Sequence, residues 1–114
     1  MKSKDRQLLL IDLCGRLPYE VKGLHRGETQ RLLIMDSFGS YQVNGYDAWF
    51  DLNSVIFKPY LRPMSSMTEE ELAEYNRFEL SDFRRIDWLN AHHFDYRGLI
   101  EKGFALEMPK DMYK

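Results

Sequence analysis

Cysteine, long apolar runs and an excess of one charge are all scarce in this sequence. The single cysteine, Cys14, has no partner for an internal disulfide, which favours a reducing compartment and a small buried side chain at this position. The apolar stretch 8–11 near the N-terminus is too short for a signal-peptide core or a membrane span. We therefore expect a cytoplasmic protein that makes no membrane contact.

Positive charge is not in excess either. Sixteen basic and eighteen acidic side chains give a net charge of −2, which argues against a dominant attraction to nucleic acid or to an anionic membrane. Residues 1–60 hold eight basic and seven acidic side chains, whereas residues 61–114 hold eight and eleven. Any contact with a polyanion is thus expected in the first half of the chain.

Sequence motifs of common catalytic sites are missing as well. The chain has neither of the glycine-rich phosphate-binding loops, and it lacks the G-x-S-x-G turn of serine hydrolases. Glu69, Glu70 and Glu71 are consecutive residues at a helix start, which differs from two carboxylates held in a cleft. We therefore predict no catalytic residue, no metal ligand and no cofactor.

One histidine-rich stretch, residues 90–97 (NAHHFDYR), could still form a metal or acid–base site. Neighbouring helical residues point about 100° apart, so His92 and His93 cannot bind one ion from a regular helix. His92 and Asp95 have a suitable spacing, but they supply only two ligands, fewer than a catalytic zinc site normally takes from the protein. The favoured interpretation is that the stretch closes one helix and starts another. A metal-dependent enzyme centred on His92 and Asp95 is the alternative.

What the sequence does contain is a change of pattern from helix to strand and back to helix. Ser3 as a cap and Gly15 with Pro18 as a stop predict a helix over residues 4–14. Five short β-branched and aromatic runs follow, at residues 20–25, 29–36, 41–43, 46–52 and 55–61. Asn44-Gly45 predicts a two-residue type I′ hairpin turn. Pro59 places the last run at a sheet edge or a strand end.

Five short strands with tight connections suit a small, bent antiparallel barrel better than a two-sheet sandwich. We expect an α+β fold with a short N-terminal helix within residues 1–18, an SH3-like antiparallel β-barrel over 19–61 and a helical C-terminal segment over 62–114. All of them belong to one domain, 1–114. An OB-like barrel and a twisted open sheet covered by helices are the alternatives.

The C-terminal segment predicts three helices. Thr68 and Glu71 form a capping box for a helix over about residues 69–78. Ser81 caps a second helix, and Asp95 caps a third that ends at Gly103. The second helix has apolar residues at a spacing of three: Phe83, Ile86 and Leu89. The side chains expected to be buried are Trp88, Leu89, Phe94, Tyr96 and Leu99. The stretch 104–109 (FALEMP) is expected to be extended.

A dense set of aromatic residues interleaved with basic ones predicts a binding surface on the strands. Such a surface can dock a peptide in an aromatic groove, or it can stack bases while it follows phosphates. The same aromatics could instead fill the interior of the barrel. The candidate binding residues are Lys22, Arg26, Arg31, Tyr41, Tyr46, Trp49, Lys58 and Arg62.

Two stretches carry a resemblance: KPYLRPMSSMTEEE at 58–71 and WLNAHHFDYRGLIEKGFALEMP at 88–109. They resemble a group of short proteins encoded by gut bacteria of the Bacteroides group and by their phages and mobile elements. The group has no assigned activity, so the resemblance transfers no site residue. It implies an accessory, regulatory or assembly role.

Taken with the missing catalytic motifs, these observations favour a non-catalytic module that contacts another protein. A nucleic-acid-binding accessory protein, which would use the basic and aromatic residues of the strands, is the alternative.

Overall fold

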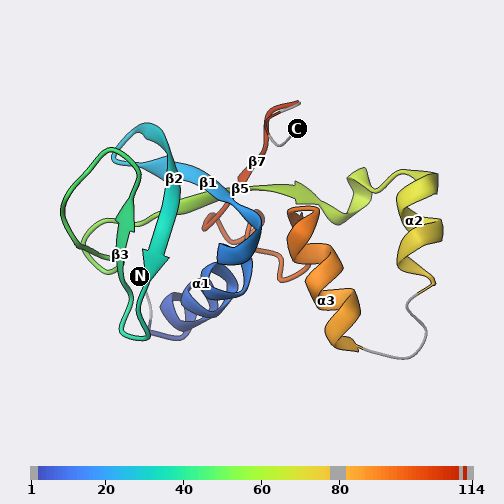
Figure 1. Ribbon diagram of the computed structural model, residues 1–114, viewed down its shortest axis with the longest axis horizontal. Helices are drawn as coiled ribbons and strands as arrows, with labels where there is room; N and C mark the ends of the chain where they lie inside the picture. Colours follow the sequence, from blue (N-terminus) through green and yellow to red (C-terminus); the bar gives the residue numbers. More distant parts are fainter. Residues whose placement is uncertain (1–2, 78–81, 111, 113–114) are drawn as a thin grey trace.

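A mixed seven-stranded sheet runs through the computed structural model, which describes residues 3–77, 82–110 and 112 (Figure 1). The helices within these residues are α1 (Ser3–Arg16), α2 (Glu69–Tyr75) and α3 (Asp82–Ala91), with short 3₁₀ turns η1 (Leu17–Tyr19) and η2 (Met64–Ser66). The strands are β1 (Val21–His25), β2 (Glu28–Met35), β3 (Ser40–Val43), β4 (Phe50–Asp51), β5 (Lys58–Pro63), β6 (Phe94–Asp95) and β7 (Leu106–Glu107).

The sheet is open. Its strand order is β4-β3-β2-β1-β5-β6, and β7 also pairs with β5. Strands β1 to β4 are antiparallel, and β5 pairs antiparallel with β1 before it pairs in parallel with β6 and β7. The α+β class is thus confirmed, but the SH3-like barrel is not observed. The reason is that β5 extends past β1 to pair with the C-terminal strands, and it does not return to close the sheet against β4.

Strand β5 connects the two ends of the molecule. It leaves the β1–β4 part of the sheet and leads to α2, which lies at the opposite end from β3 (Figure 1). Pro59 is the second residue of β5, opposite Gly23 of β1. A sheet edge or a strand end was predicted for this proline; β5 lies inside the sheet order and is not an edge strand, and Pro59 is next to the first residue of β5.

The tight hairpin lies at Arg26-Gly27. His25 pairs with Glu28, and the two residues between them have φ values of 52° and 82°, as a type I′ turn requires. At the predicted position, only Gly45 has a positive φ (92°), and β3 and β4 are joined by the wider loop 44–49. The two-residue turn predicted at Asn44-Gly45 is therefore wrong.

Helix α1 extends through Gly15, two residues further than predicted, and it buries a different face. The buried residues Leu9, Asp12, Leu13 and Arg16 follow a spacing of three and four. Cys14 is exposed, so its predicted burial is wrong. The apolar pattern indicated the wrong face because two of the buried residues are charged.

These two charges are paired inside the protein. Arg16 Nε donates to Asp12 Oδ2 (2.7 Å), and Arg16 Nη2 donates to the carbonyl oxygen of Phe94 (2.6 Å). Arg97 Nε adds a third contact, to Asp12 Oδ1 (3.1 Å). The network fixes α1 against β6 and the residues that follow it.

The capping box at the start of α2 is confirmed. The N–H of Glu71 donates to Thr68 Oγ1 (3.1 Å), and the N–H of Thr68 donates to Glu71 Oε1 (3.0 Å). The helix ends at Tyr75, earlier than predicted. Ser81, the predicted cap of the next helix, lies outside the described residues.

Helix α3 buries Trp88, Leu89 and Asn90, whereas Phe83 and Ile86 are exposed, contrary to their predicted packing. The reason is that its C-terminal half packs against α1 while its first turns extend beyond that contact. Of the side chains expected to be buried, Trp88, Leu89, Phe94 and Leu99 are buried and Tyr96 is half-buried.

Asp95 starts a turn instead of the predicted third helix. Its two carboxylate oxygens accept the N–H groups of Leu99 and Ile100 (both 2.9 Å). Turns follow as far as Gly103, which has a φ of 81°. The extended conformation predicted for 104–109 is confirmed by β7. No described helix has the length and apolar character needed to cross a membrane.

Candidate binding groove and aromatic rim

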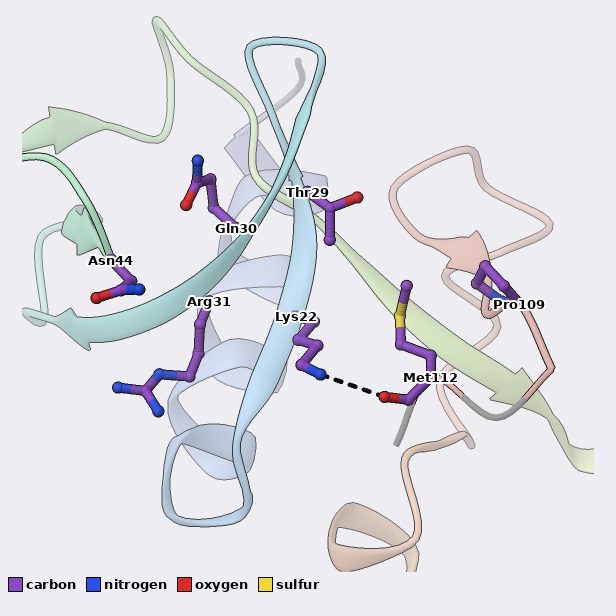
Figure 2. A pocket seen from close by; sticks show the side chains of 7 residues that line it. All are labelled: Lys22, Thr29, Gln30, Arg31, Asn44, Pro109 and Met112. Carbon is purple, nitrogen blue, oxygen red and sulfur yellow. Dashed lines mark hydrogen bonds between the residues drawn. The ribbon is translucent and has the colours of Figure 1, made fainter. Parts of the chain in front are cut away.

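A groove of about 440 Å³ lies over β1 and β2 (Figure 2). Lys22 is directly opposite Arg31 in the β1–β2 pairing, so both side chains belong to the same face of the sheet. Val21 and Gly23, on either side of Lys22, are buried on the other face. The residues that line the groove are Lys22, Thr29, Gln30, Arg31, Asn44, Pro109 and Met112.

One wall of the groove comes from the described residues that follow β7, Met108 to Lys110 and Met112, which we call the C-terminal segment. The N–H of Met108 donates to the carbonyl oxygen of Leu61 (2.8 Å), which holds the start of the segment beside β5. Lys22 Nζ donates to the carbonyl oxygen of Met112 (3.2 Å), as the dashed line in Figure 2 shows. A peptide carbonyl of the chain itself is therefore seated in the groove.

Beside the groove, Arg26 and Tyr46 both contact the ring of Phe50, and Trp49 directly precedes Phe50 in the chain; we call Arg26, Tyr46 and Trp49 the aromatic rim. Tyr46 is 37% exposed and Trp49 is 53% exposed. The Tyr46 hydroxyl donates to Glu28 Oε2 (3.0 Å), and this hydrogen bond raises the pKa of Tyr46 above its ordinary value. Gln30 Nε2 donates to the same Glu28 oxygen (3.3 Å), so the rim and the groove adjoin at Glu28.

The rim rests on a buried histidine. The ring of His25 contacts Phe50, Tyr46 and Tyr41 at centroid distances of 4.5, 5.7 and 5.8 Å. This packing explains the wide loop 44–49. Tyr46 near the start of the loop and Phe50 directly after it both contact the same imidazole, so the chain between them cannot form a two-residue turn. The guanidinium of Arg26 lies 5.9 Å from the Phe50 ring centroid. The positions of the rim side chains are thus set by contacts to the core.

His25 is neutral in this setting. The Tyr41 hydroxyl donates its one proton to the carbonyl oxygen of Val55 (2.7 Å), so it accepts from His25 Nδ1 (3.1 Å). His25 Nε2 is then an unprotonated acceptor, and no partner for it lies among the described residues. Burial, together with the positive charge of Arg26, lowers the pKa of His25 below its ordinary value.

The structure brings five of the eight candidate binding residues together. Lys22 and Arg31 line the groove, and Arg26, Tyr46 and Trp49 form the rim. Sequence reasoning missed Thr29, Gln30 and Asn44; of these, only Thr29 shares the face of Lys22 and Arg31 in the β1–β2 register. It also missed Pro109 and Met112, for which the sequence contains no local signal.

The other three candidates lie elsewhere. Tyr41 is fully buried, so its assignment to a binding surface is wrong; it lies on the inward face of β3 with Val43. Lys58 lies in β5 and does not line the groove. Arg62 holds Glu71 with two contacts of 2.7 Å and lies 4.1 Å from the Phe94 ring centroid. Its role is to fix α2 and β6 to β5.

The stretch 90–97 lines a second cavity, of about 230 Å³. Helix α3 ends at Ala91 and His93 has a φ of 64°, so His92 and His93 both face this cavity. The divergence of about 100° expected within a regular helix does not apply to them, because both follow the last residue of α3. Asp95 does not line this cavity, because its carboxylate accepts the two backbone N–H groups described above.

The other groups at this cavity are already engaged. Glu71 lines it, but the hydrogen bond from Arg62, the largest influence, lowers the pKa of Glu71 to about 2. Within the residues that the structure describes, no group of three or more His, Cys, Asp or Glu side chains could hold a metal ion. The observed contacts of this stretch are structural.

His93 gives the fold a pH dependence. Burial, and then the positive charge of Arg16, lowers the pKa of His93 from 6.5 to about 4. Between these values the unfolded chain binds a proton that the folded chain does not, so the free energy of unfolding should decrease as the pH falls. We expect His93 to contribute a loss of about 2 kcal/mol between pH 7 and pH 5, measured by urea unfolding.

The matched control for this prediction is His93→Asn. Asparagine tolerates the left-handed backbone at this position and does not titrate. The variant should therefore lose less stability than the wild-type protein between pH 7 and pH 5. An identical loss in both proteins would contradict the role of His93.

The groove offers positive charge and hydrogen-bonding groups, and the rim offers exposed aromatic rings beside an arginine. This combination is common at the energetically dominant positions of protein interfaces. Comparison of the chain with protein-family models, curated proteins and solved structures found no match. The arguments for function that follow therefore start from the groove and the rim.

Proposed function

We propose that this protein is a non-catalytic interaction module that contacts another protein through the groove and the aromatic rim. The observation that carries the proposal is the pairing of Lys22 directly opposite Arg31. Like charges at directly opposite positions destabilise a sheet. Glu20 Oε1 lies 3.9 Å from Lys22 Nζ and partly offsets this repulsion, and a negative group of a partner that faces Arg31 would offset it further.

The aromatic rim supports the same proposal. Tryptophan, tyrosine and arginine dominate the binding energy of many protein interfaces. Tyr46 is held by its hydrogen bond to Glu28 and Arg26 by its position over Phe50, so these side chains lose little freedom when a partner binds. The rim is therefore suited to bind a partner without prior rearrangement of Arg26 and Tyr46.

A protein partner is favoured over nucleic acid by the distribution of charge. The carboxylate of Glu28 lies between the rim and the groove, where it would repel a phosphate backbone that follows both, whereas a protein segment can carry carboxylates at Lys22 and Arg31 alone and neutral side chains beside Glu28. Arg62 is paired with Glu71, which removes one candidate phosphate contact. The resemblance to short proteins of Bacteroides-type bacteria, phages and mobile elements suits an accessory role of this module in the cytoplasm.

The test is affinity capture of partners with the wild-type chain and two variants. A protein captured from a lysate of a Bacteroides-type gut bacterium should bind at least about tenfold less to Trp49→Ala, because interface tryptophans are frequent energetic centres. Phe83→Ala is the matched control, since Phe83 is 84% exposed and lies on α3, away from the rim. It should capture the same protein at the wild-type level, as quantified by mass spectrometry.

Both substitutions affect exposed side chains, so both variants should fold, which circular dichroism would verify. The proposal is contradicted if Trp49→Ala captures the same proteins as the wild-type chain. It is also contradicted if Trp49→Ala and Phe83→Ala reduce capture equally.

A further inference from the structure

We infer that the groove binds an extended protein segment with carboxylate side chains on one face, and that the C-terminal segment of this chain competes with it. This inference rests on the proposed function and specifies the chemistry of the partner. It also assigns a regulatory role to the contact between Lys22 and Met112.

The placement of the two cations, directly opposite each other on adjacent strands, suits carboxylates that project from one side of a partner. Lys22 and Arg31 project from adjacent strands on one face. In an extended segment, every second side chain points the same way, at a repeat of about 6.6–6.8 Å. Alternate glutamates or aspartates can therefore face the two cations from the same side of one segment. A helical partner would need carboxylates three or four residues apart.

Arg31 is the stronger candidate for specific recognition. Its guanidinium makes no hydrogen bond or ion pair with the described part of the chain, and in Figure 2 it extends away from β2 and away from Met112. A guanidinium can hold a carboxylate through two parallel hydrogen bonds. The side chains of Thr29, Gln30 and Asn44 supply donors and acceptors for the peptide groups of the same segment.

The C-terminal segment already places one peptide carbonyl oxygen against Lys22, at the wall of the groove. The Met112 carbonyl oxygen lies 3.2 Å from Lys22 Nζ, and the Met112 and Pro109 side chains complete the wall. A carboxylate is a stronger acceptor for an ammonium group than a neutral carbonyl oxygen is. An acidic segment would therefore displace Met112 from Lys22. Met108 can keep its hydrogen bond to the carbonyl oxygen of Leu61, so the displacement involves only residues that follow Met108.

The probe for this inference is a fluorescein-labelled eight-residue peptide in which threonine and glutamate alternate. Its binding to the full chain is measured by fluorescence anisotropy at about 50 mM salt, where charge contacts are weakly screened. We expect saturable binding that Lys22→Gln and Arg31→Gln each weaken at least about tenfold. Lys102→Gln makes the same charge change on an exposed residue outside the groove and should bind as the wild-type chain does.

Folding of the groove variants is expected. Each substitution removes one member of the like-charged pair, and Lys22→Gln also removes the ion pair with Glu20 and the ammonium contact to Met112, so both variants should change stability in urea by less than about 1 kcal/mol. The inference is overturned if the peptide does not bind, or if the same peptide with glutamine in place of glutamate binds equally well. It is also overturned if a labelled oligothymidylate of equal charge binds more tightly with the same dependence on Lys22, since the ligand class would then be single-stranded nucleic acid.

The competition is tested separately with Met112→Ala. Loss of this side chain weakens the seat of the C-terminal segment, so the acidic peptide should bind about two- to fivefold more tightly. Unchanged or weaker binding would exclude competition. If the acidic peptide does not bind but Trp49→Ala still reduces partner capture, this inference is refuted and the proposed function stands. If the peptide does not bind and Trp49→Ala captures the same proteins as the wild-type chain, both are refuted.

Discussion

Asp12→Ala is expected to lower the free energy of unfolding by about 3–5 kcal/mol, because it leaves the fully buried Arg16 without its counter-charge. Arg97 would lose the same carboxylate. The remaining contact of Arg16, to the carbonyl oxygen of Phe94, is a hydrogen bond to a neutral group. Because small domains are stabilised by only about 5–15 kcal/mol in total, a large part of the protein should be unfolded at 37 °C. Urea unfolding followed by circular dichroism measures the change.

Two further variants distinguish the effect of the buried ion pair from a general effect on helix α1. Asp5→Ala removes an aspartate from the first turn of the same helix and should change stability by less than about 1 kcal/mol. The double variant Asp12→Leu with Arg16→Met should recover part of the loss, since an apolar pair avoids a buried unpaired charge. A stability of Asp12→Ala within about 1 kcal/mol of the wild-type value would show that the network is not required.

The second large effect is expected from Gly23→Ala, with a loss of about 3 kcal/mol or more. A Cβ atom at this position would lie 2.5 Å from Phe57 Cε1 and 2.6 Å from the carbonyl oxygen of Lys58. The first neighbour is a fully buried ring and the second is backbone, so neither can move without displacing β5 from β1. Urea unfolding should show this loss as a lower transition midpoint.

Gly15→Ala is the matched control for this substitution. The added Cβ atom would meet Asn90 Nδ2 at 3.4 Å, which is an ordinary contact. Gly15 lies in α1, where alanine is favoured over glycine by up to about 1 kcal/mol, so this variant should be as stable as the wild-type protein or more stable. A similar loss in both variants would contradict the close approach of β5 to Gly23.

Local signals predicted the parts of the fold that depend on neighbouring residues. The capping box at Thr68 and Glu71 was confirmed because both of its hydrogen bonds lie within one turn of helix. Each of the five runs of β-branched and aromatic residues contains a strand, although only Phe50–Asp51 of the run 46–52 is in one and β5 starts at Lys58, because strand preference is read over a few residues. The hairpin at Asn44-Gly45 was wrong, since the packing of Tyr46 and Phe50 on the buried His25 decides the loop.

The candidate site was predicted only in part, because residue type can be read from the sequence whereas the direction of a side chain cannot. Lys22, Arg26, Arg31, Tyr46 and Trp49 were found as basic and aromatic residues on strands and their connections; Lys22 and Arg31 line the groove, and Tyr46 and Trp49 are exposed in the loop 44–49. Tyr41 belongs to the same set of aromatic residues in the sequence, but its side chain faces inward and is fully buried. Met112 lines the groove from 90 positions away along the chain from Lys22, and only the path of the chain after β7 brings it there.

The sequence by itself therefore determined the α+β composition, the caps and the approximate strands, because these depend on interactions within a few residues. Only the tertiary structure decided the open sheet, since the extension of β5 to the C-terminal strands is a contact between distant segments. It also decided that the buried face of α1 carries Asp12 and Arg16, because a charge can be buried only when its partner and a carbonyl oxygen meet it in space. The groove follows from the same distant contacts, which no local pattern of residues encodes.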